Sequence, residues 1–111
     1  MKATNGSNCI VLEDDRHDIL NFSSYLERIV PSNYENSNLI INLLKYNSLD
    51  LDQLLSFLKL STYHRSTKHS FVIVNDAINV DDIPDEIILV PSLQEATDII
   101  EMEEIERDLG F

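Results

Sequence analysis

Four short apolar runs, separated by segments with helical spacing, constrain the fold of this chain more than any other feature. The runs have the length of buried strands, and the segments between them repeat apolar residues every three or four positions. This alternation predicts an α/β fold, in which a mainly parallel sheet of four to five strands carries packed helices and the chain ends in an acidic helix. The runs are residues 8–12, 39–44, 71–74 and 87–90.

Local signals place the boundaries of the first elements. Residues 1–7 contain no apolar run and are predicted to be a disordered polar N-terminus. Residues 8–111 are then expected to form one domain. Asp15 is the expected N-cap of the first helix, and Pro31 is expected to end it.

The second and last helices begin with capping patterns. Asp50 with Gln53 resembles a capping box, and Ser92 with Glu95 repeats the pattern before the last helix. Helical spacing predicts an inward leucine face for the second helix, with Phe57 on its flank. The leucines of that face are Leu51, Leu54, Leu55 and Leu58.

Charge is distributed unevenly along the chain. Residues 1–68 contain eight acids and seven bases, whereas residues 69–111 contain twelve acids and a single base, Arg107. The formal net charge of −12 argues against nucleic acid and anionic membranes as partners, because binding phosphate needs clustered cations. The acidic half is either a solvated face or a docking surface for a basic partner.

The residue types that carry catalysis or metal binding form no recognisable pattern. Cys9 is the only cysteine, so no internal disulfide or thiolate cage can form, and a buried, inert thiol is expected. His17, His64 and His69 lack the spacing of paired helical ligands and are expected at the surface. The only two glycines lie near the chain ends, which excludes a glycine-rich phosphate loop. We therefore predict no catalytic residue, no metal and no cofactor.

Residues 8–100 resemble the STAS domain, the fold of anti-sigma factor antagonists and of sulfate-transporter tails. The resemblance rests on the strand at 39–44, the leucine-rich helix at 50–60, the strand at 71–74 and the strand–serine–helix at 87–100. More narrowly, residues 70–74, 82–86, 90–96 and 101–111 resemble a group of short bacterial STAS-like proteins. The genes of that group tend to neighbour the gene of ribonuclease Z. The metallohydrolase motif His-x-His-x-Asp-His is absent, so the resemblance implies no nuclease activity.

The resemblance also points to a site at the start of the second helix. The family's motif Asp-Ser-[Ser/Thr]-Gly, whose second hydroxyl residue is phosphorylated, falls on residues 50–53, Asp-Leu-Asp-Gln. Asp52 occupies the phosphosite-equivalent position and has no hydroxyl, so it is not phosphorylatable. Partners dock at this helix edge in the family, which implies partner-binding roles for Asp50, Asp52 and Gln53.

The last helix has two apolar sets that cannot share one face. Leu93, Ala96, Thr97 and Ile100 form one set, whereas Met102, Ile105 and Leu109 point about 120–180° away at 100° per residue. Either the helix bends near Glu101, or the far set is exposed. Residues 101–111 are accordingly either a tail that folds back over the domain edge or a docking tail that inserts a set of apolar side chains into a partner groove. That set is Met102, Ile105, Leu109 and Phe111.

These observations lead to an expected function. The chain is interpreted as a cytoplasmic, non-enzymatic protein-interaction or regulatory module, whose partner is a protein such as an anti-sigma-like regulator. The alternative is an accessory protein to RNA processing that acts with ribonuclease Z. The sequence predicts no oligomeric state.

Overall fold

A five-stranded mixed, mostly parallel sheet forms the centre of the protein, as the computed structural model of residues 1–78 and 83–110 describes it. The strands lie in sequence order; β1 is antiparallel to β2, and the other neighbours are parallel. The predicted α/β fold with a mainly parallel sheet is therefore confirmed. The strands are β1 (Lys2–Asn5), β2 (Ile10–Glu13), β3 (Leu39–Asn42), β4 (Phe71–Val74) and β5 (Ile88–Val90).

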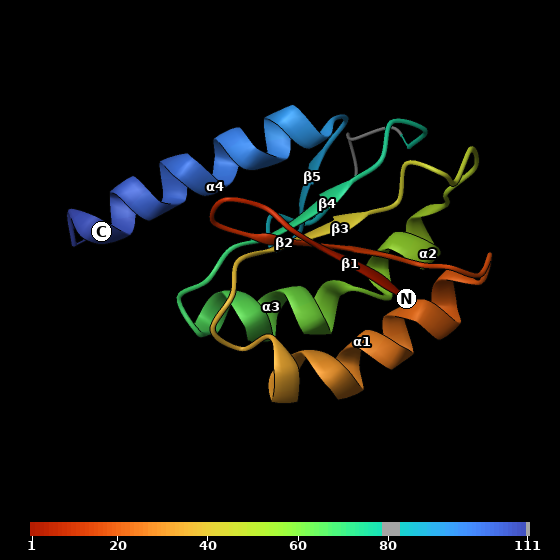
Figure 1. Ribbon diagram of the computed structural model, residues 1–111. Helices are drawn as coiled ribbons and strands as arrows, with labels where there is room; N and C mark the ends of the chain where they lie inside the picture. Colours follow the sequence, from red (N-terminus) through yellow and green to blue (C-terminus); the bar gives the residue numbers. More distant parts are fainter. Residues whose placement is uncertain (79–82, 111) are drawn as a thin grey trace.

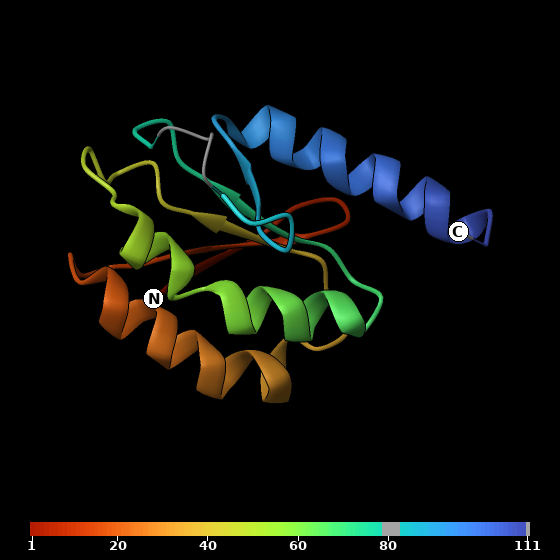
Figure 2. The same cartoon turned by 180° about the vertical axis from the view of Figure 1, so that it is seen from behind.

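The helices cover the two faces of the sheet unequally. Three of them, α1, α2 and α3, lie on one face, and α4 lies alone on the other (Figures 1 and 2). Because β3 and β4 are covered on both sides, their apolar residues are buried, as a continuous apolar run predicts. The helices are α1 (Ile19–Asn33), α2 (Leu51–Leu55), α3 (Leu58–Ser66) and α4 (Leu93–Asp108).

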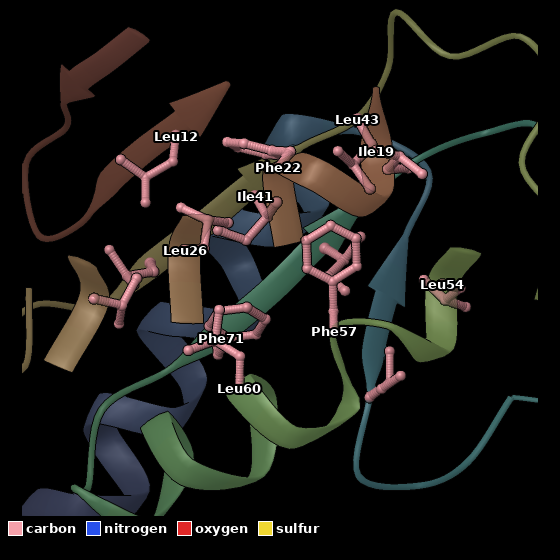
Figure 3. Packing of buried hydrophobic residues seen from close by; sticks show 14 of the residues in the cluster. Leu12, Ile19, Phe22, Leu26, Ile41, Leu43, Leu54, Phe57, Leu60 and Phe71 are labelled. Carbon is pink, nitrogen blue, oxygen red and sulfur yellow. The ribbon is translucent and has the colours of Figure 1, made fainter. Parts of the chain in front are cut away.

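The main hydrophobic core lies between the sheet and the face formed by α1, α2 and α3 (Figure 3). Phe22 of α1 meets Phe57 edge to face, with ring centroids 6.4 Å apart. Leu12, Ile41 and Phe71 approach from the sheet. A smaller cluster fills the α4 face and contains Cys9, Ile40, Val72, Val74, Ala96 and Ile100.

The prediction of a disordered N-terminus is wrong, because Lys2–Asn5 forms the edge strand β1. Its backbone pairs with β2 in a register that joins Lys2 to Glu13 and Asn5 to Ile10. All four side chains of β1 are exposed, so this strand needs no apolar alternation, and the sequence carries no pattern that would reveal it.

The first helix begins and ends later than predicted. Asp18, rather than Asp15, is the N-cap, and its side chain accepts from the Asn21 backbone N–H. The chain first makes a turn in which the Asp14 carboxylate accepts backbone N–H groups, and this turn delays the helix. Pro31 lies inside α1, whose last turn still closes through the Tyr34 N–H and the Val30 carbonyl at 2.9 Å.

The second helical segment is broken in two. The chain leaves α2 at Leu55 and starts α3 at Leu58, so Phe57 turns into the core instead of lying on a flank. Leu54 is buried as predicted, whereas Leu51 is exposed because it begins α2 at the edge of the core. In the part of the chain that the structure describes, no helix has both the length and the apolar character needed to span a membrane.

Candidate protein-interaction site

The outward side of α4 exposes three large apolar side chains, which we call the α4 stripe. Met102, Ile105 and Leu109 have exposed fractions of 53%, 60% and 67%. Met102 and Ile105 lie in α4, and Leu109 is its C-cap with a helical backbone conformation. Because the three residues are three and four positions apart, they share one face. Of the two alternatives predicted for this helix, exposure of the far set is the one observed.

The inward side of α4 changes character along the helix. Ala96 and Ile100 are fully buried against the sheet, as predicted. Thr97 is partly buried, whereas Leu93 is exposed, contrary to its predicted place on the inner face. Leu93 is the first residue of the helix, one turn ahead of the first buried position.

Beyond Ile100, the inward side of α4 is held by polar contacts rather than by apolar packing. Glu103 accepts from the Ser70 hydroxyl at 2.6 Å and pairs with the Arg65 guanidinium at 3.2 Å. Arg107 donates to the Asn38 side-chain oxygen and to the Ser70 hydroxyl, both at 3.3 Å. These contacts join α4 to α3 and to the residues that precede β3 and β4, so the second half of α4 is fixed to the body of the protein.

The candidate residues at the start of α2 form a helix cap. The Asp50 side chain accepts from the Gln53 N–H at 2.8 Å, and the Gln53 side-chain oxygen accepts from the Asp50 N–H at 3.1 Å. The predicted capping box is thus confirmed. Asp52 is exposed in the first turn of this five-residue helix. Asp50 and Gln53 therefore have structural roles that are sufficient to explain their side chains.

The two predicted partner-binding regions are not brought together. Residues 50–53 lie with α1 and α3 on one side of the sheet, and the α4 stripe lies on the other (Figures 1 and 2). A partner that covers one region does not reach the other without wrapping around the sheet edge. Phe111, the fourth apolar residue predicted for the docking tail, lies outside the described residues.

A buried polar contact at the carboxyl end of β2 has no signal in the sequence. The Tyr46 hydroxyl donates to the Asp14 carboxylate at 2.5 Å, and the Lys45 ammonium donates to the Asp14 and Arg16 carbonyl oxygens. Burial, followed by the hydrogen bond to Asp14, raises the pKa of Tyr46 above its ordinary value. The phenol therefore stays protonated at neutral pH and serves as a donor that joins the end of β2 to the loop after β3.

His64 is buried in α3, contrary to the expectation of a surface histidine. Its Nε2 lies 2.7 Å from the Ser37 carbonyl oxygen, which can only accept, so Nε2 carries the proton. The unprotonated Nδ1 has no hydrogen-bond partner within the described residues. Burial lowers the pKa of His64, because a charged ring in this position would lack water.

The remaining candidate groups are a single buried thiol and a hollow lined by opposite charges. The Cys9 thiol is buried, as predicted, and burial raises its pKa. A hollow of about 350 Å³ beside α1 brings Arg16 and Arg28 close to Asp14 and Asp15, whose charges oppose theirs. Over residues 1–78 and 83–110, no three histidine, cysteine, aspartate or glutamate side chains are grouped so that they could hold a metal ion.

Comparisons with known proteins add no assignment to this geometry. No protein-family model matches the chain, and no curated protein matches it.

Proposed function

We propose that this protein is a non-enzymatic protein-interaction module with a regulatory role, and that the α4 stripe is its partner-binding surface. The observation that carries the proposal is the reversed amphipathicity of the second half of α4. Its apolar side chains face outward, and its inward side is already satisfied by Ser70, Arg65 and Asn38.

The energetics of exposed apolar side chains favour a covered state. Full burial of a leucine, isoleucine or methionine side chain contributes about 1.5–3 kcal/mol. Three such side chains at helical spacing match the way in which an amphipathic helix enters an apolar groove. Because α4 is already helical and attached to the body, binding would not require the ordering of a flexible segment.

The finer assignment, a STAS-like fold that has lost its phosphorylation switch, belongs to the same proposal. It is supported by the mostly parallel sheet and by Asp50, which caps a helix at the position where the resemblance places the family motif. At the phosphosite-equivalent position, Asp52 provides a fixed negative charge instead of a modifiable hydroxyl. Recognition would then be constitutive at this helix edge and would not be switched by phosphorylation there.

The test is a paired capture experiment. Tagged wild-type protein is compared with Met102→Ser/Ile105→Ser as bait in lysate of the native host, and retained proteins are quantified by mass spectrometry. The matched control is Leu20→Ser, which removes an exposed apolar side chain from α1 on the opposite face. The proposal requires a partner that the wild-type and control baits retain and the double variant loses.

The identity of that partner separates the two functions that the sequence suggests. An anti-sigma-type kinase would support the regulatory role, and ribonuclease Z would support the RNA-processing alternative. Equal retention of every captured protein by all three baits would remove the α4 stripe as a binding surface.

A further inference from the structure

The α4 stripe is bordered on both sides by carboxylates, which we call the α4 rim. At about 100° per residue, Glu101 and Asp108 lie on one side of the stripe, and Glu106 lies on the other. All three side chains belong to exposed residues. The outward surface of this half of α4 therefore combines an apolar centre with an acidic border.

Within the described residues, no cation forms an ion pair with this border. Arg107, the only base among residues 69–111, points inward to Asn38 and Ser70. The ion pairs found among the described residues join Met1 to Asp15 and Arg65 to Glu103, and neither includes a rim carboxylate. Glu106 also lines a hollow with Arg65, Lys68 and Arg107, which offset part of its charge without forming an ion pair with it. The rim carboxylates are thus unpaired in the described part of the chain and available to a partner.

We infer that the partner presents an apolar groove bordered by lysine or arginine side chains, and this inference rests on the proposed function. A stable interface buries about 800 Å² on each partner. Three side chains do not supply this area alone, so a partner that covers the α4 stripe also covers the rim. Carboxylates removed from water require opposite charges and hydrogen-bond donors, and lysine or arginine side chains provide both.

The same charges argue against other occupants. If a second copy of this chain covered the α4 stripe with its own, the two acidic α4 rims would meet, and their like charges would repel. Nucleic acid and anionic lipid would present phosphates to the same carboxylates. A basic protein groove is the occupant whose charge complements the surface, and its attraction to the acidic half would also speed the encounter.

The test uses a synthetic probe in place of the partner. The probe is a helical peptide of about three heptads, with leucines along one face and lysines bordering them; the matched peptide carries glutamates instead. Binding is measured by fluorescence anisotropy at two salt concentrations. Wild-type protein should bind the lysine peptide, more weakly at high salt because exposed charges are screened, and should not bind the glutamate peptide.

Two triple variants with the same change in net charge locate the effect. The rim variant is Glu101→Gln/Glu106→Gln/Asp108→Asn, and the control is Glu27→Gln/Glu35→Gln/Asp76→Asn, whose exposed side chains belong to α1, to the loop after α1 and to the loop after β4. The rim variant should bind the lysine peptide about tenfold more weakly, whereas the control should bind it like the wild type.

The outcomes separate this inference from the proposed function. Equal affinities of the rim and control variants, or no binding of the lysine peptide by the wild type, would contradict the inference that the partner has a basic border. Neither result would affect the paired capture experiment, which tests the proposed function. Unchanged binding by Met102→Ser/Ile105→Ser would instead count against the α4 stripe itself.

Discussion

The two halves of α4 differ in what they bury, although they form one continuous helix. The first half places Ala96 and Ile100 in the cluster that covers the sheet. The second half turns Glu103 and Arg107 inward, to polar residues that precede β3 and β4, and leaves its apolar residues in water. The contribution of α4 to the hydrophobic core therefore ends near Ile100, and the residues beyond it are available for another purpose.

The largest expected effect on stability comes from a comparison of two isoleucines in the same helix. Ile100→Ala removes a fully buried side chain and should lower the free energy of unfolding by about 2–5 kcal/mol. Ile105→Ala removes an exposed side chain and should change it by less than about 0.5 kcal/mol. Urea denaturation of both variants measures the difference. Similar losses for the two variants would mean that the outer half of α4 is part of the core.

Deletion of residues 102–111 tests the same boundary with a larger change. The truncated protein should still melt cooperatively, because the main core and Ile100 remain. The deletion removes the polar contacts of Glu103, Glu104 and Arg107. At roughly 1 kcal/mol for each residue, this loss should lower the free energy of unfolding by about 3 kcal/mol. Calorimetry would detect the alternative, a broad and non-cooperative transition, which would show that this segment is required for folding.

The features that could be predicted from the sequence are those whose physical cause is local. The apolar runs predicted the buried strands β3 and β4, since a strand covered on both faces has no polar side. The capping box at Asp50 and the exposed α4 stripe also follow from spacing within one helix. Each of these features depends on residues only a few positions apart.

The remaining features depend on contacts that no side-chain pattern in the sequence signals. Glu103 meets Ser70 and Arg65, and no spacing in the chain indicates this meeting. The edge strand β1 is polar and exposed, so its pairing with β2 depends on backbone groups that every sequence has. His64 is a polar residue on a buried helix face, and its burial results from tertiary packing rather than from the spacing of neighbouring residues.

His64 provides a pH-dependent contrast with the inward side of α4. The Glu103 and Arg107 side chains under α4 have partners, whereas His64 Nδ1 has none within the described residues, and its titratable neighbours are His69 and Glu35. Because the folded pKa is lowered, the unfolded chain binds the proton first as pH falls below about 6.5. Protonation of His64 should therefore not lower the free energy of unfolding above that pH. The free energy of unfolding should decline below that pH by up to about 1.4 kcal/mol per pH unit until the folded pKa is reached.

Two variants isolate this effect from the titration of other groups. His64→Gln keeps an N–H that can donate to Ser37 and cannot be protonated, so the pH dependence between about 7 and 5 should become shallower. His17→Gln, which alters an exposed histidine, is the matched control. Chemical denaturation across this pH range provides the measurement, and equal slopes for the two variants would exclude His64 as the source.

The smallest expected effect compares two glutamates on opposite sides of the second half of α4. Glu103→Gln weakens the contacts to Ser70 and Arg65 and should lower the free energy of unfolding by about 1 kcal/mol, since both partners are partly screened by solvent. Glu106→Gln removes an exposed rim charge and should change stability by less than about 0.5 kcal/mol. The same two variants should rank in the opposite order in binding of the lysine peptide, because Glu106 borders the α4 stripe and Glu103 lies beneath the helix. Opposite orders in stability and in peptide binding would separate the residues that attach α4 to the sheet from those that meet a partner. The same order in both measurements would contradict that division.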